Sequence, residues 1–171
     1  MKQQLNFWII GLAIVNLLAM TSCDDYDDED NAQPAATEKT YTLNPLSNSG
    51  VSGTVSFRKQ DDQTTMIIVQ LSGTQAENSH PAHIHSGDAS SGGPIVLDFN
   101  PVDGATGRSE TSVTALNDGT AITYEELIAF NGHVNVHLSA AQLQVMIAQG
   151  NIGSNSQGSS NPDGGGDGDG Y

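Results

Sequence analysis

Apolar and polar residues alternate through most of the middle of the chain, which is the pattern of half-buried strands. Residues 51–57 alternate in this way, and residues 65–71 form a β-branched run after the turn signal Asp-Asp-Gln at 61–63. The two segments are therefore expected to form an antiparallel hairpin. Further segments of this kind lie at residues 40–43, 82–85, 94–99, 107–116 and 133–138. Because turn signals separate these short segments, the pattern predicts an all-β barrel or sandwich over residues 38–153.

Two short helices are predicted beside the last long strand. Residues 123–132 begin with the capping box Thr-Tyr-Glu-Glu and end with a glycine. Residues 139–150 begin with Ser-Ala-Ala-Gln, which is a second capping box, and also end with a glycine. Within this second helix, Leu143, Met146 and Ile147 form an apolar stripe that is expected to pack on the core.

Both ends of the chain depart from the strand pattern. Residues 151–153 are expected to form a last edge strand, after which residues 154–171 are mostly Gly, Ser, Asn and Asp. That tail has almost nothing to bury, so it is expected to be disordered. At the other end, residues 1–22 combine a Lys with an apolar run that is too short to span a membrane comfortably, which is typical of a signal peptide.

The only cysteine, Cys23, follows this leader directly, so the chain forms no internal disulfide. The segment Met20-Thr21-Ser22-Cys23 resembles a bacterial lipobox. This resemblance implies cleavage before Cys23, lipidation of that residue and attachment to a membrane surface through acyl chains. The alternative is a plain secretory signal with a stray cysteine.

The net charge is −15, from 20 acidic and 5 basic residues. A nucleic-acid partner is therefore not expected, because phosphate binding needs Lys and Arg. Much of the acidity lies in residues 24–30, so residues 23–37 are interpreted as a lipidated cysteine followed by a solvated tether. The acidic run also resembles a signal that sends lipoproteins to the outer face of the outer membrane. The alternative is a spacer without that role.

All five histidines lie in two short segments that are predicted to be strands. His80, His83 and His85 belong to the first segment, and His133 and His137 belong to the second. The spacing of His83 and His85 puts both imidazoles on one face of a strand, with backbone positions about 7 Å apart. Neutral imidazoles that converge from one face are a common start to a copper or zinc site. The alternative is that these histidines are ordinary residues of a solvated strand face.

The region 38–153 resembles a CHRD (chordin-type) domain of bacterial lipoproteins. The resembling segments are Ala82-His83-Ile84-His85, Gly93-Pro94-Ile95-Val96-Leu97 and Gly150-Asn151-Ile152-Gly153. More remotely, the chain is similar to copper/zinc superoxide dismutase. That similarity rests on the pattern His80-x-x-His83-x-His85-x-Gly87-Asp88, on Phe99-Asn100-Pro101 and on Val136-His137. It implies an eight-stranded Greek-key barrel, with His83, His85 and His137 as copper ligands and His80 as a hydrogen-bonded loop histidine.

Several features of the dismutase are missing. No histidine lies just before Phe99-Asn100-Pro101, where the enzyme has its bridging ligand, and no histidine occurs between His85 and His133. No Lys or Arg follows Arg108, so the late arginine that guides superoxide is also absent. An acidic surface repels an anionic substrate. These differences argue against rapid superoxide dismutation.

The metal site is predicted from side-chain parity. Ala82, Ile84, Val136 and Leu138 are expected to point into the barrel, so that the intervening His83, His85 and His137 point outward. If the two strands are neighbours, these three imidazoles meet under a loop and hold one Cu or Zn ion, with an open fourth position.

His80 and His133 are minor candidates for the same ion. His133 lies about 13 Å along its strand from His137, which makes a shared ion difficult. Asp88 and Asp98 are lesser candidates, interpreted mainly as loop and turn residues. Two functions stay open: a surface-anchored binding module with or without a metal, and a copper oxidoreductase of superoxide dismutase type.

Overall fold

The structure is a computed structural model, and it describes residues 37–158 of the chain. The predicted signal peptide, the predicted lipidation site Cys23 and nearly all of the predicted acidic tether lie outside the described residues, as do residues 159–171 of the predicted tail. Within residues 37–158, no helix is long and apolar enough to cross a membrane.

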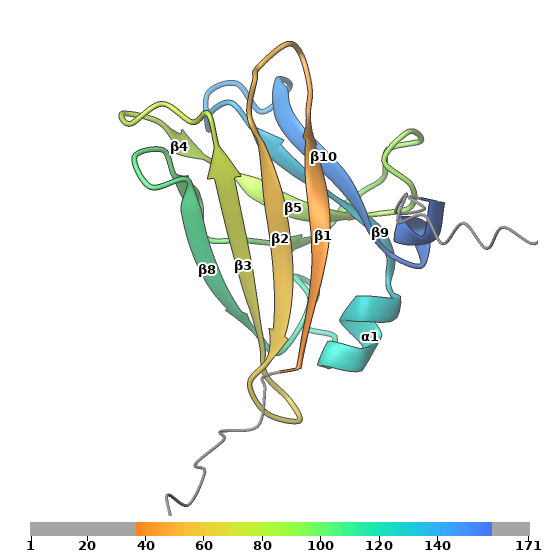
Figure 1. The fold of residues 1–171 in the computed structure, drawn as a ribbon. Helices are drawn as coiled ribbons and strands as arrows, with labels where there is room; N and C mark the ends of the chain where they lie inside the picture. Colours follow the sequence, from red (N-terminus) through yellow and green to blue (C-terminus); the bar gives the residue numbers. More distant parts are fainter. Residues whose placement is uncertain (1–36, 159–171) are drawn as a thin grey trace, which may run out of the picture. The chain divides into compact units, whose positions relative to one another are not determined.

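Strands make up about half of the described part of the chain, and almost none of it is helical (Figure 1). They are β1 (Glu38–Pro45), β2 (Ser52–Lys59), β3 (Thr65–Ser72), β4 (Ser79–His80), β5 (Ala82–Ser86), β6 (Ile95–Asp98), β7 (Val102–Asp103), β8 (Arg108–Val113), β9 (Asn131–His137) and β10 (Met146–Gly153). The helical elements in this region are α1 (Tyr124–Ala129) and the 3₁₀ helix η1 (Ser154–Gly158). The predicted all-β class is therefore confirmed.

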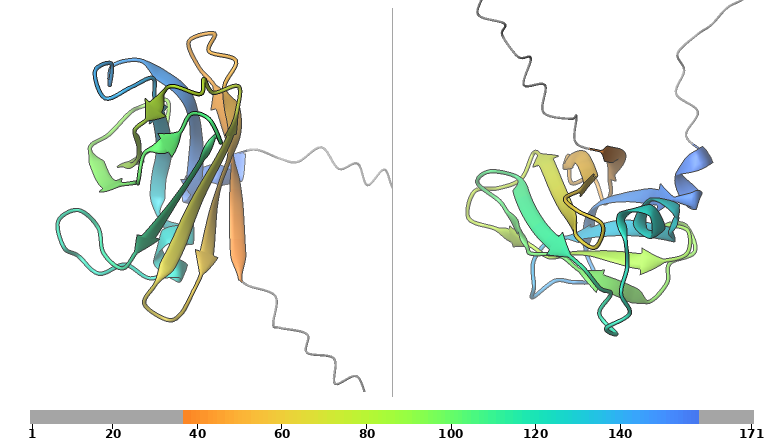
Figure 2. Two further views of the ribbon diagram at one scale, coloured as in Figure 1. Left: turned by 90° about the vertical axis from the view of Figure 1, so that its left-hand side faces the viewer. Right: turned by 90° about the horizontal axis from the view of Figure 1, so that it is seen from below.

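The strands form one antiparallel sheet that curls into a half-barrel. The order is β4-β7-β8-β3-β2-β1-β10-β9-β5-β6. We call β4 to β1 of this order the first sheet half and β10 to β6 the second sheet half. Figure 2 shows the two halves as two layers that face each other. The neighbours β3 and β8, and likewise β5 and β9, are far apart in sequence, so the chain crosses between the halves as in a Greek-key arrangement.

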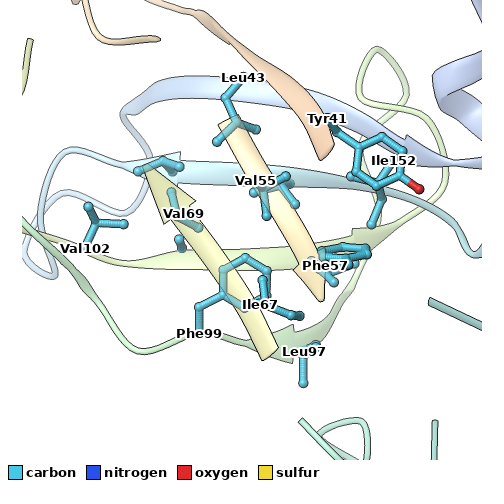
Figure 3. Packing of buried hydrophobic residues seen from close by; sticks show 14 of the residues in the cluster. Tyr41, Leu43, Val55, Phe57, Ile67, Val69, Leu97, Phe99, Val102 and Ile152 are labelled. Carbon is cyan, nitrogen blue, oxygen red and sulfur yellow. The ribbon is translucent and has the colours of Figure 1, made fainter. Parts of the chain in front are cut away.

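The core lies between the two sheet halves (Figure 3). From the first half, Val55, Phe57 and Val69 point inward and are fully buried. From the second half, Ile84 and Ile152 meet them and are almost fully buried. Burial of apolar surface at about 25 cal/mol per Å² is the main force that holds the two layers together.

Several local predictions are confirmed. Strands β2 and β3 form the expected hairpin, with Lys59 paired to Thr65. The first predicted helix forms as α1, where the Thr123 side chain accepts a hydrogen bond from the Glu126 backbone and the Glu126 carboxylate accepts one from the Thr123 backbone. This reciprocal bonding satisfies amide groups that the first helical turn leaves free. The helix ends at Ala129, before Gly132.

The second predicted helix, over residues 139–150, is wrong. Residues 139–145 form turns, and the chain then enters strand β10 at Met146. This strand is central, because it pairs with β9 on one side and with the end of β1 on the other. Gly150 is not a helix stop: a Cβ there would clash with the backbone carbonyl of Thr42 in β1. Pairing with two neighbouring strands therefore outweighs the local helical pattern.

Two further details differ from the sequence-based expectation. Residues 151–153 belong to the central strand β10, not to an edge strand, and residues 154–158 form η1 in place of the start of a disordered tail. The described region also contains ten strands in place of eight. The two additional strands are β4 and β7, which have two residues each and pair with each other. These differences leave the predicted barrel-like architecture unchanged.

Candidate metal centre

Strand pairing brings the two histidine segments together. His85 lies opposite His133, and His83 lies opposite Asn135, on the adjacent strands β5 and β9. Their neighbours Ala82, Ile84, Val134 and Val136 are fully buried in the core or nearly so. Because side chains alternate across a strand, the histidines point to the other side of the sheet, which we call the outer face. The predicted parity is confirmed.

Three imidazoles gather on this outer face. The ring centroids of His83 and His137 are 5.1 Å apart, those of His83 and His85 are 6.1 Å apart, and those of His85 and His137 are 6.5 Å apart. One nitrogen from each ring lies within 4.8 Å of the others. Three nitrogens that bind one zinc ion at 2.0–2.1 Å are about 3.3–3.6 Å apart. Side-chain rotations that bring each pair of nitrogens closer by up to about an ångström therefore place all three within reach of a single ion.

Hydrogen bonding selects the free nitrogen of His85. Its Nδ1 lies 2.8 Å from the backbone oxygen of Gly93. A carbonyl oxygen only accepts, so Nδ1 carries the proton and Nε2 keeps its lone pair. That Nε2 is buried and has no hydrogen-bond partner among the described residues. His85 is thus set to offer Nε2 to an ion.

His83 is set in the opposite sense. Its Nε2 lies 3.6 Å from a carboxylate oxygen of Asp98, the residue opposite it on β6. This carboxylate favours the tautomer with a proton on Nε2, which leaves the lone pair on Nδ1. The Nδ1 atom is buried and has no hydrogen-bond partner within residues 37–158. A carboxylate behind a metal-binding histidine is the usual way to fix its tautomer and orientation.

His137 completes the group. It is only 6% exposed, and neither of its ring nitrogens has a hydrogen-bond partner within 3.5 Å among the described residues, although the nearby Leu143 backbone acts to raise the pKa of this ring. Buried polar side-chain atoms are normally hydrogen-bonded, so several unpartnered nitrogens that face one another require an explanation. A metal ion with an affinity for imidazole supplies one, and the residues present fit Cu or Zn.

Burial also favours the charge state that binds metal. It lowers the pKa of His83 and His137 below the ordinary histidine range, because the charged form loses hydration. The Asp98 carboxylate opposes this shift in the pKa of His83, whereas His83 adds to the lowering of the pKa of His137. Both rings are therefore neutral at pH 7, as metal ligands must be.

The minor candidates His80 and His133 lie outside this group of three. His80 is 2% exposed, and its Nδ1 lies 2.9 Å from the backbone oxygen of Leu138. It is the hydrogen-bonded histidine that the resemblance implied. His133 is fully buried, bonds the backbone oxygen of Gly87 through Nδ1 at 2.8 Å, and stacks on His85 at 5.1 Å. His80 thus bonds the backbone at the end of β9, whereas His133 bonds the loop backbone at Gly87 and packs against the His85 ring.

Asp88 and Asp98 have different roles. Asp88 accepts a hydrogen bond from the side-chain amide of Asn151, and the Asn151 side-chain oxygen accepts one from the Ala89 backbone. These bonds hold the loop of residues 87–93 over β10. The carbonyls that position His85 and His133 belong to this loop, at Gly93 and Gly87. Asp88 is thus a loop residue as expected, whereas Asp98 faces His83.

Sequence reasoning missed the polar residues that surround the histidines. Asn135 lies between His133 and His137 on β9, and its side-chain oxygen accepts a hydrogen bond from Gln149 at 2.8 Å. Gln149 also reaches the backbone oxygen of Ala89, which ties the outer face to the loop above it. Asn135 shares the parity of the two histidines, and this signal was available in the sequence.

The fold and the histidine group together define an antiparallel β domain with a three-imidazole cluster on the outer face of its second half. The family model of the CHRD domain matches residues 34–162, which is more than half of the chain. The chain therefore belongs to the CHRD domain family, a membership that suggests a binding domain. No curated protein matches the sequence.

Proposed function

We propose that this CHRD domain is a binding module that holds one Cu or Zn ion through His83, His85 and His137. The single observation that carries the proposal is the set of unpartnered, buried nitrogens that these three rings turn toward one another. Three imidazoles are a frequent ligand set for both metals. Copper or zinc would act there as a Lewis acid or, for copper, as a redox centre.

The chain's own residues have separate parts in this proposal. His85 offers Nε2 because Gly93 holds the proton on Nδ1, and His83 offers Nδ1 because Asp98 faces Nε2. The loop of residues 87–93 positions the rings, because its Gly93 and Gly87 backbone oxygens lie at hydrogen-bonding distance from Nδ1 of His85 and of His133. With three histidine ligands for a four-coordinate ion, one position is left for water, a small molecule or a further side chain.

The direct test is the metal content of the purified protein after loading with copper and with zinc. Wild type is expected to hold one ion, and His83→Ala is expected to abolish stoichiometric binding. His133→Ala is the matched control, because that ring lies outside the group of three and should leave the stoichiometry unchanged. If wild type carries no metal after loading, the histidines are scaffold and the domain is a metal-free binding module.

A copper oxidoreductase is the second candidate, favoured by the open coordination position that three ligands leave. The sequence has no Lys or Arg after residue 108 that could attract anionic superoxide, which argues against rapid turnover. A superoxide assay on copper-loaded protein separates the two candidates. Activity that disappears in His83→Ala would support the oxidoreductase, and loading without activity would support the binding module.

We also propose that the mature protein is a bacterial lipoprotein anchored through Cys23, with residues 24–37 as its tether. The support is the short apolar leader, the lipobox-like segment that ends at the lone cysteine and the acidic run after it. The acidic run further supports exposure on the outer membrane surface.

Cys23→Ser should release the protein from membranes and block normal processing. Surface exposure is tested by protease treatment of intact cells, with a periplasmic protein as control.

A further inference from the structure

A methionine lies beside the histidine group on the outer face. In the pairing of β9 with β10, Met146 is directly opposite His137. Directly opposite residues of an antiparallel pair put their side chains on the same face, with Cβ atoms about 4.5–5.5 Å apart. The long, flexible Met side chain therefore starts within reach of the His137 ring.

A bulge in β10 is what turns Met146 toward the histidines. Counting back by twos from Ala148, which is fully buried in the core, would put Met146 in the core as well. The register shifts between Met146 and Ala148, however, so that Ile147 becomes the buried residue. An extra residue of this kind reverses the side-chain alternation and re-aims the neighbouring side chains.

Burial agrees with this orientation. Met146 is partly buried, and it belongs neither to the core cluster nor to the hydrophobic residues packed against that cluster. Gln149 on the same strand faces the outer side, since its amide bonds the Asn135 side chain between the two β9 histidines. Met146 and Gln149 thus flank β9 on the face where the imidazoles gather.

We propose that the Met146 thioether is a fourth protein ligand of the metal site and that the ion held is monovalent copper. This inference rests on the proposed function of the histidine group. Thioether sulfur is a soft ligand that selects Cu(I), whereas zinc in proteins is held by imidazole, thiolate and carboxylate. Three imidazoles and one thioether form a neutral set that suits a monovalent ion in a half-buried site, where unbalanced charge is costly.

The experiment compares Cu(I) and Zn(II) affinities by competition with chromophoric chelators. A Cys23→Ser background removes the thiol, so that methionine is the only sulfur ligand that the chain offers. Met146→Leu keeps the side-chain volume and removes the sulfur. Met66→Leu is the matched control, because Met66 is another partly buried strand methionine that lies on β3 of the first sheet half.

Met146→Leu is expected to weaken Cu(I) binding at least about tenfold, the lower end of what loss of a supporting residue costs at a metal site. Zn(II) affinity should stay unchanged, and Met66→Leu should change neither affinity. X-ray absorption of the Cu(I)-loaded protein should show a sulfur neighbour that disappears in Met146→Leu. This spectrum needs no variant to establish whether sulfur is bound.

The outcomes separate this inference from the proposed function. If the protein binds neither Cu(I) nor Zn(II), the proposed metal site fails and the inference fails with it. If it binds both ions, but with only nitrogen and oxygen neighbours around copper and with equal Cu(I) affinity in Met146→Leu, the histidine site stands. In that case the thioether ligand is ruled out, and Met146 only packs against the outer face.

Discussion

The outer faces of the two sheet halves carry polar residues in the same alternation, but their surroundings differ. On the first half, Thr40 and Ser56 bond each other at 2.6 Å on an exposed surface, and Arg58 pairs with Glu38 at 2.9 Å. On the second half, His133, Asn135 and His137 are all buried. The loop of residues 87–93 lies over the second of these faces, since its Gly87 and Ala89 backbone oxygens bond the side chains of His133 and Gln149.

This difference shows that alternation predicts which way a side chain points but not whether water reaches it. Polar groups on the exposed outer surface of the first half, such as Thr40 and Ser56, have a neighbouring side chain or solvent as a partner. On the second half, both nitrogens of His137 and one nitrogen each of His83, His85 and His133 have no partner among the described residues. An unpartnered buried nitrogen is costly, so a covered polar face is a much stronger sign of a ligand than an exposed one.

The largest effect is expected from the inner face of β5. Ile84 is 1% exposed and lies between His83 and His85 in sequence but points into the core. Ile84→Ala should lower the free energy of unfolding by about 2–5 kcal/mol through lost burial and a cavity. Metal-free His83→Ala should be far less destabilised in the same urea titration. Equal losses would show that the outer histidines act as core packing.

Metal bound on the second sheet half should stabilise the folded domain. At a free ion concentration of one hundred times the Kd, binding to the folded state adds about 2.7 kcal/mol to the free energy of unfolding. Thermal unfolding with and without copper or zinc should therefore show a rise in Tm that a chelator reverses. His137→Ala is expected to show no such rise, and a full rise in that variant would contradict the three-histidine site.

A smaller effect is expected at Asp98, which faces His83 from β6. Asp98→Asn keeps the shape but removes the charge that favours the tautomer with Nδ1 free. Metal affinity should fall about 10- to 100-fold, as for other residues that support a metal ligand. Glu110→Gln on β8 is the control, because it changes an exposed carboxylate of the first half. Similar affinities for wild type and Asp98→Asn would mean that the carboxylate is a surface group only.

The smallest effect is a pH dependence of the metal-free fold. Burial lowers the pKa of His83, His133 and His137 in the folded protein. Above the unfolded value of about 6.5 these rings are neutral in both states and contribute nothing. Below it the unfolded chain binds protons first, so stability falls until the lower folded pKa values are reached.

Urea titrations between pH 7 and 5 check this pH dependence. The loss of stability over that range should be smaller in His137→Ala, which lacks one of the three shifted groups. An identical loss in the variant would mean that burial of His137 does not oppose its protonation.

The sequence by itself determined the all-β class, the hairpin of β2 and β3 and the capping box of α1, because each depends on residues that are close along the chain. It also determined the outward orientation of His83, His85 and His137, since the two-residue period of a strand assigns each side chain to a face. The identity of the three grouped histidines followed from that parity together with the resemblance to the dismutase pattern.

Only the tertiary structure decided how these pieces combine. Local pattern favoured a helix over residues 139–150, but pairing with β1 and β9 makes residues 146–150 part of a central strand. Such pairing depends on residues that are distant in sequence. The bulge at Ile147, which turns Met146 toward His137, exists only in the pairing of β10 with β9. The cover of residues 87–93 likewise depends on Asn151, which lies more than fifty residues further along the chain. Local alternation thus determined which side chains lie on the outer face. Long-range contacts determined how far these side chains are buried and which residues lie beside them.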